Sequence, residues 1–242
     1  FITALIPTVS SAKATGNFDT AKKRIEFTLL TTILIGLPCM VGLIVFAEPI
    51  LKLLFPNQLS GAFILKVSAT SIIFIVLEQT ISGILQGFGK SYVPAIALGV
   101  GVIVKLILNN ILIPINPEIF ILGGTAGAAV STTICHLVAF TIDMYVMSKY
   151  IKLDLKISSY IVKPIIATIM MAICAIYINK LLLCIISEKL CTILSLLIAA
   201  ILYVILVFCL KIFSKDNIFM IPYGQKIYEL LVILGIYEKD KN

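Results

Sequence analysis

The stretch CTILSLLIAAILYVILVFCL, residues 191–210, contains no charged side chain. As a helix it is about 30 Å long, which matches the hydrocarbon core of a bilayer. A soluble domain carries about 25% charged residues, whereas this chain of 242 residues has 13%, with 60% apolar residues and a mean hydropathy of +1.13. The composition indicates an integral membrane protein, because a globular surface cannot accommodate so much apolar side chain in contact with water.

The same length criterion predicts an all-α integral membrane protein with about six spans. They cover about residues 27–47, 61–86, 92–113, 121–147, 164–184 and 191–213. The segments at residues 48–55 and 227–236 are too short to span, and we expect them to lie along the outer and inner membrane surfaces respectively.

This pattern divides the chain into four parts. We expect residues 1–26 to hold the end of a preceding membrane helix and a cytoplasmic loop, and residues 27–148 to hold four membrane helices. Residues 149–213 provide two more, and residues 214–242 form a cytoplasmic tail with an interfacial amphipathic helix. The sequence opens on Phe1 without a signal peptide, so we expect a portion of a longer protein.

The distribution of basic residues predicts the orientation. If the first loop is cytoplasmic, 14 of the 19 Lys and Arg residues fall on the inner side: Lys13, Lys22, Lys23, Arg24, Lys90, Lys149, Lys152, Lys156, Lys163, Lys211, Lys215, Lys226, Lys239 and Lys241. The positive-inside rule therefore places both ends of the chain in the cytoplasm of a bacterial plasma membrane.

The net charge of +7 does not indicate nucleic-acid binding, because the basic residues sit in short clusters between apolar runs. The six cysteines indicate neither a metal site nor structural disulfides, although a Cys184–Cys191 bridge across a short loop is conceivable. The motifs of phosphate-binding loops, zinc proteases and serine hydrolases are missing. We therefore expect no catalytic residue, no metal and no cofactor.

Polar residues at helical spacing inside the spans are the candidate site. Glu78, Ser82 and Gln86 share one face of the second span, and Lys105 and Asn109 share one face of the third. Ionisable groups inside hydrocarbon are costly unless they serve a function. We predict that Glu78, Gln86, Lys105 and Asn109 line a cavity between helices.

The fourth span adds His136 and Asp143 as a possible proton relay. Other interpretations remain open at several of these positions. Ser82 is expected to bond its own helix, His136 to serve in packing or hydrogen bonding, and Asp143 to pair with Lys149. A direct Glu78–Lys105 ion pair is compatible with the depths of the two residues but is not required.

Several motifs resemble one family. The stretches Ala4–Ser10, Ala21–Arg24, Leu34–Pro38, Ala47–Ile50 and Gln79–Lys90 do so, together with Lys105, Asn109 and Ile113-Pro114. They are similar to the stage V sporulation protein B family of polysaccharide-biosynthesis transporters, in the multidrug/oligosaccharidyl-lipid/polysaccharide flippase superfamily. The resemblance covers nearly all of residues 1–213.

The resemblance implies a fold of about 14 helices, of which this chain holds the C-terminal lobe and two extra helices. It also implies alternating-access transport of a lipid-linked oligosaccharide or cell-wall precursor, with Na⁺ or H⁺ as a possible coupling ion; sporulation is only a family inference. Two other functions remain open: a cation-coupled multidrug antiporter with Glu78 as the coupling carboxylate, and a non-transporting membrane scaffold.

Overall fold

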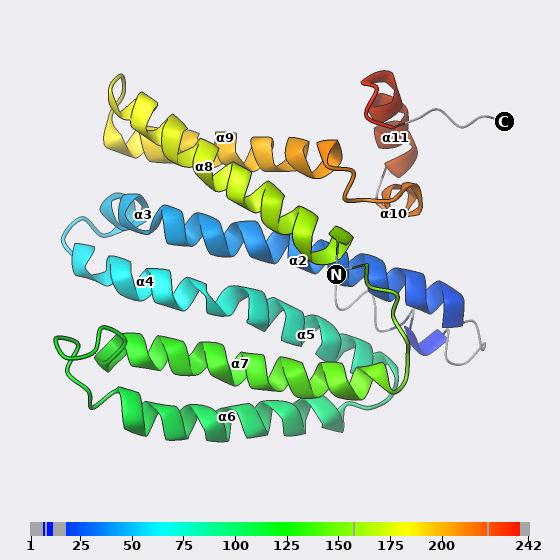
Figure 1. Ribbon diagram of the computed structural model, residues 1–242, viewed down its shortest axis with the longest axis horizontal. Coiled ribbons are helices and arrows are strands. Elements are labelled where there is room, and N and C mark those ends of the chain that lie inside the picture. The colour runs from blue at the N-terminus through cyan, green and yellow to red at the C-terminus, as the bar shows by residue number, and fades with distance from the viewer. Residues whose placement is uncertain (1–6, 8, 12–17, 157, 222, 238–242) are drawn as a thin grey trace. The chain divides into compact units, whose positions relative to one another are not determined.

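The computed structural model describes residues 7, 9–11, 18–156, 158–221 and 223–237 (Figure 1). Within these residues every regular element is helical. The chain divides into two compact units, residues 1–154 and residues 155–242. The α-helices are α2 (Phe18–Val45), α3 (Ala47–Leu54), α4 (Ala62–Ala69), α5 (Ser71–Gly87), α6 (Tyr92–Leu112), α7 (Gly124–Ser148), α8 (Lys163–Leu183), α9 (Glu188–Cys209), α10 (Lys215–Phe219) and α11 (Gly224–Ile233).

Six helical segments in the described chain are long and apolar enough to cross a membrane, which confirms the predicted count. They are Asp19–Val45, Leu59–Gly87, Tyr92–Leu112, Gly124–Ser148, Ser158–Leu183 and Glu188–Cys209. Large apolar side chains such as Ile103, Leu106 and Ile107 of α6 are more than half exposed. Water would penalise such surfaces, whereas lipid accepts them.

The first helix begins earlier than the apolar pattern predicts. α2 starts at Phe18, so Lys22, Lys23 and Arg24 lie within its first turns rather than before it. Composition locates only the part of a helix that hydrocarbon can hold. The backbone hydrogen bonds continue into the polar headgroup region, where charged side chains are stable.

This charged start of α2 is tied to the segment that follows α7. The Lys22 ammonium donates to the Asp154 carboxylate at 2.5 Å, and the Asp154 backbone N–H donates to Glu26 Oε1 at 2.8 Å. The lysine holds the pKa of Asp154 below its usual range. An exposed ion pair adds little stability, so its main effect is to fix where the chain leaves α7.

In the first unit α7 packs between α5 and α6, and α2 packs on α4 and α5 (Figure 1). Small residues allow the close approach of α6 and α7. A Cβ atom added at Gly101 would stand 2.5 Å from the Cys135 carbonyl oxygen, and one at Gly127 would stand 2.6 Å from Leu112 Cβ. Small-residue contacts of this kind are the usual way in which membrane helices pack.

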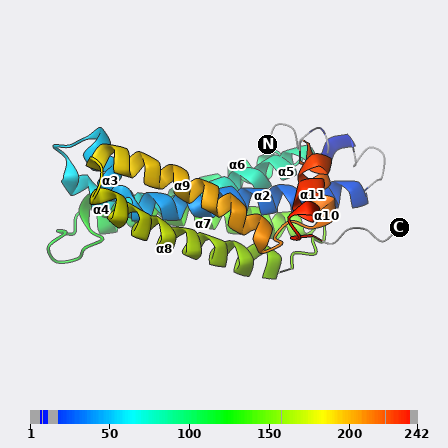
Figure 2. The same cartoon turned by 90° about the horizontal axis from the view of Figure 1, so that it is seen from above.

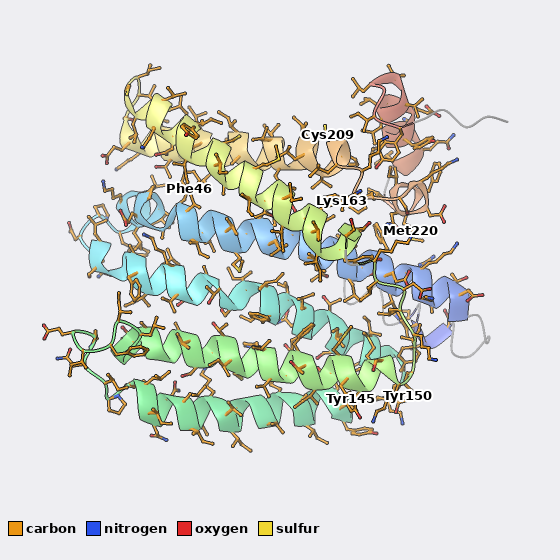
Figure 3. The ribbon with its side chains drawn as sticks, in the orientation of Figure 1. Phe46, Tyr145, Tyr150, Lys163, Cys209 and Met220 are labelled. Carbon is orange, nitrogen blue, oxygen red and sulfur yellow. The ribbon has the colours of Figure 1, made fainter. Side chains whose placement is uncertain are left out.

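Aromatic and basic side chains gather where α5 and α7 end. Tyr145 and Tyr150 lie at that end of α7 (Figure 3). Lys149 stands 4.3 Å from the centre of the Tyr145 ring, and Lys90 stands 5.5 Å from that of Tyr150. Tyrosine and lysine are typical of the membrane–water interface. This end is the one that the charge pattern assigns to the cytoplasm.

The predicted short segment after the first span is the helix α3. Glu48 in its first turn accepts from Lys66 of α4 at 3.0 Å. At eight residues α3 is about 12 Å long and cannot span a bilayer. Its position along the outer surface remains a prediction.

The second unit is built on the antiparallel pair α8 and α9 (Figure 2). The Asn179 amide donates to Ser195 Oγ at 3.3 Å, and the Cys191 thiol donates to the Asn179 carbonyl at 3.2 Å. All six cysteines are free. The conceivable Cys184–Cys191 bridge is not formed, because Cys191 is turned toward α8 and bonds Asn179.

The contact between α6 and α7 gives a stability prediction. Gly101→Ala should destabilise the protein by about 1–3 kcal/mol, because the new methyl group meets backbone that cannot yield without separating the two helices. Gly99→Ala on the same helix meets nothing within 4 Å and is the matched control. Thermal unfolding in detergent measures both, and equal midpoints for the two variants would contradict the packing described.

The cysteines give a test of orientation. Cys184 follows α8, whereas Cys209 ends α9, about 33 Å away along a helix of 22 residues, at the same end as Lys163 (Figure 3). In intact cells a membrane-impermeant maleimide should label the wild type through Cys184. Cys184→Ala should abolish this labelling, and Cys209→Ala should leave it unchanged. The opposite result would invert the predicted topology.

Candidate functional site

The centre of the candidate site is a serine placed between two carboxyl groups. Ser82 lies one turn after Glu78 on α5, and Asp143 comes from α7. Ser82 Oγ stands 3.1 Å from Glu78 Oε1 and 3.1 Å from Asp143 Oδ2. Glu78 is 6% exposed and Asp143 is fully buried. Two acidic side chains from neighbouring spans therefore share one hydroxyl in the interior of the first unit.

The hydroxyl has one proton, so it can donate to only one of the two carboxylates at a time. The other contact becomes a hydrogen bond when that carboxyl is itself protonated and donates to the Ser82 oxygen. Two carboxylates held against one hydroxyl in the protein interior also repel each other. The arrangement of Glu78, Ser82 and Asp143 is thus suited to share a single proton, or another monovalent cation.

His136 of α7 lies on the other side of Glu78. Its Nδ1 is 3.7 Å from Glu78 Oε2, which suits an ion pair when the imidazole is protonated but is too long for a hydrogen bond. The same Nδ1 is buried without a hydrogen-bond partner, as is Asp143 Oδ1. The cluster therefore has unused donor and acceptor positions on both of its α7 side chains.

The cluster is one of several polar contacts between neighbouring helices of the first unit. Thr70, at the junction of α4 and α5, is 3.2 Å from Thr133 of α7, and Thr80 of α5 is 3.0 Å from Thr32 of α2. Inside a membrane such hydrogen bonds contribute to helix association. The polar faces of α5 and α7 thus contact each other directly.

On the other side of α7, the polar residues of α6 follow the Gly101 contact. Lys105 and Asn109 lie one and two turns after Gly101 and are half-buried. Asn109 Oδ1 is buried without a hydrogen-bond partner. Cys135 of α7 lies within electrostatic reach of both Lys105 and Glu78, so the cation and the acidic cluster flank the same stretch of α7.

The structure brings some predicted residues together and separates others. Glu78, His136 and Asp143 form one cluster. Lys105 makes no ion pair with Glu78, because α7 lies between their helices. The depths of the two residues in the membrane do not reveal that α7 packs between α5 and α6. Gln86 is exposed at the end of α5 and lies outside the cluster.

One of the local interpretations is wrong, and another holds in part. Asp143 bonds Ser82, whereas Lys149 lies over the Tyr145 ring. Ser82 contacts its own helix through the Glu78 side chain and also contacts Asp143 of α7, unlike Thr132, whose hydroxyl donates to the Ala128 carbonyl. The signal that was available for Ser82 is its four-residue spacing from Glu78. In the described chain no three His, Cys, Asp or Glu side chains come together as a metal site.

Six apolar spans with a buried acidic cluster are typical of membrane transporters. The profile of the MatE family matches residues 1–111. The chain is 32% identical over 143 residues to the uncharacterized membrane protein YabM of Bacillus subtilis, which covers 59% of this chain and 25% of that protein. It is 27% identical over 110 residues to the lipid II flippase MurJ of the same organism, covering 43% and 20%.

Residues 1–111 therefore resemble the MatE family, and the resemblance to the superfamily of polysaccharide and lipid flippases is confirmed. The matched segments span a quarter or less of the length of these relatives. The MatE match includes Glu78, Gln86, Lys105 and Asn109, whereas His136 and Asp143 follow it.

The shared hydroxyl gives a prediction about stability. Ser82→Ala removes the only group that both carboxyls contact and should lower the free energy of unfolding by about 1–3 kcal/mol. Asp143→Asn keeps an acceptor for Ser82 without a second charge and should be neutral or stabilising. Thermal unfolding in detergent measures both.

The matched control is Thr141→Ala, since this exposed hydroxyl bonds only the Leu137 carbonyl of its own helix. Two results would contradict the description of Glu78 and Asp143 as a pair that carries one negative charge. One is that Ser82→Ala unfolds at the same temperature as this control, and the other is that Asp143→Asn is the more destabilising of the two site variants.

Proposed function

We propose that this chain is the C-terminal part of a membrane transporter that moves a lipid-linked oligosaccharide or cell-wall precursor across the plasma membrane by alternating access. The observation that carries the proposal is Lys105. It stands 13 residues from the start of α6 and seven from its end, well inside an apolar span. A cation at that depth is costly unless an anionic group visits it.

The chemistry of α6 suits the headgroup of such a substrate. The Lys105 ammonium can bind a phosphate or pyrophosphate through charge-assisted hydrogen bonds. Asn109, whose Oδ1 is buried without a partner, can accept from a sugar hydroxyl. The relative that is named a lipid II flippase supports a lipid-linked substrate.

The acidic cluster provides a means of coupling. In this proposal the Glu78–Ser82–Asp143 group takes up H⁺ or Na⁺ on one side of the membrane and releases it on the other. Loading cancels one of the two negative charges and strengthens the contact of α5 with α7, whereas release leaves two carboxylates in repulsion. His136, whose Nδ1 lies 3.7 Å from Glu78 Oε2, passes a proton to Glu78 in this proposal once the two atoms approach to hydrogen-bond distance.

A cation-coupled drug antiporter is the second candidate, because the same cluster fits Glu78 as the coupling carboxylate. Lys105 argues against cationic drugs, since like charges repel. A non-transporting scaffold is the third candidate. The three differ in what crosses the membrane.

The test uses the full-length gene product in proteoliposomes with a fluorescent lipid-linked saccharide. Lys105→Ala should reduce translocation at least about tenfold, the equivalent of losing one charged hydrogen bond, whereas Lys105→Arg should retain most of it. Lys66→Ala, which removes a cation paired with Glu48, is the control. An unchanged rate for Lys105→Ala overturns the assigned role.

Two further readouts separate the alternatives. Efflux of a cationic dye that needs an H⁺ or Na⁺ gradient and fails in Glu78→Gln, without movement of the saccharide lipid, identifies the antiporter. The absence of both activities from a correctly folded full-length protein identifies the scaffold.

A further inference from the structure

The helix α11 has three distinct sides, and one of them is packed. Gly224, Ile227, Tyr228 and Leu231 recur at helical spacing and are buried or half-buried. They face α10, where the Phe219 and Tyr228 rings stand 5.4 Å apart. A Cβ atom at Gly224 would collide with the Ile218 carbonyl oxygen. This side is therefore closed by the protein itself.

The second side is polar. Gln225 and Glu229 lie one turn apart and are exposed, and the Gln225 amide stands 3.5 Å from Glu229 Oε1. The third side is exposed and mainly apolar: it carries Tyr223 (78% exposed), Leu230 (57%), Ile233 (84%) and Leu234 (62%), with Lys226 among them. An exposed apolar side next to an exposed polar side is unfavourable for a helix that is surrounded by water.

The position of α11 within the second unit explains the apolar side. The membrane helix α9 ends at Cys209, and the Tyr237 hydroxyl, just after α11, donates to the Phe213 carbonyl at 2.7 Å. Lys211 stands 5.9 Å from the centre of the same Tyr237 ring. These contacts hold α11 at the end of a span, which is where the membrane surface lies.

The direction of α11 fits the same surface. In both Figure 1 and Figure 2 α11 runs across the direction of α9 and does not continue it. A helix transverse to a span lies in the plane of the membrane. Its ten residues make about 15 Å, too short to cross hydrocarbon but enough to lie at the headgroup boundary.

From these observations we infer that α11 is a membrane-surface anchor whose occupant is the lipid of the leaflet in which α9 ends. Leu230, Ile233 and Leu234 insert among the acyl chains, Tyr223 and the Lys226 stem lie at the headgroup level, and Gln225 with Glu229 faces water. Lys226 and Glu229 cancel in charge, so insertion depends on apolar contact more than on anionic lipid. The inference is independent of the transported substrate.

These 242 residues contain no tryptophan, so the emission of one introduced indole is measured as the difference between each variant and its parent protein. We compare Leu230→Trp with the matched control Gln225→Trp in the full-length protein, reconstituted in phosphatidylcholine vesicles with and without acyl-brominated lipid. The indole of Leu230→Trp should emit at shorter wavelength, lose intensity to bromine and resist aqueous acrylamide. That of Gln225→Trp should behave in the opposite way. Thermal unfolding verifies that both variants fold.

Two outcomes overturn the anchor, and a third overturns apolar insertion as its cause. Equal acrylamide quenching at both positions means that the apolar side stays in water. Protection of the Leu230→Trp indole from acrylamide and bromine alike means that protein covers it, from a partner or a second copy. A vesicle series with added phosphatidylglycerol tests the charge argument: a large gain in bromine quenching with anionic lipid would replace apolar insertion by headgroup attraction as the cause of binding.

Discussion

Inside hydrocarbon a polar side chain cannot form hydrogen bonds with water, so it needs a partner within the protein. The packing of the helices in the first unit depends on this requirement. Ser82 stands 3.1 Å from each of two carboxyl groups on different spans. If α5 turned about its axis or slid along α7, Asp143 would lose Ser82 and Glu78 would lose the neighbouring His136, at a cost of several kcal/mol for a charged group left without a partner. The cluster therefore fixes the rotation and height of α5 against α7, while small residues fix α6 against α7.

The number of membrane spans and the ionisable residues within them were predictable from the sequence. Span length follows from hydrocarbon thickness, so the number of membrane helices needs only counting. Glu78 and Lys105 stand out because an ionisable residue within an apolar run is rare. The limits of a helix are less accessible, as the early start of α2 shows, since backbone hydrogen bonds do not stop where apolar composition does.

The partners of the candidate residues were not predictable from one sequence. A four-residue spacing tells which residues share a face of a helix but not which helix that face meets. An Asp143–Lys149 pair near the end of the span is therefore open from the sequence, although the position of Asp143 on α7 directs it to Ser82. In the same way Glu78 and Lys105 are compatible in depth, but α7 lies between α5 and α6 and keeps them apart.

Because α7 lies between α5 and α6, it contacts both the helix of the acidic cluster and the helix of Lys105. The acidic cluster acts on one side of α7 through Ser82 and His136, and the cation of α6 lies on the other side, beyond the close contact of Gly101 with Cys135. If packed helices move as rigid bodies, the proposed loading or release of a cation would shift α7 against α5 and carry α6 and Lys105 with it. In the proposed transport cycle, coupling ion and substrate headgroup are thus linked through one helix and need no direct contact with each other.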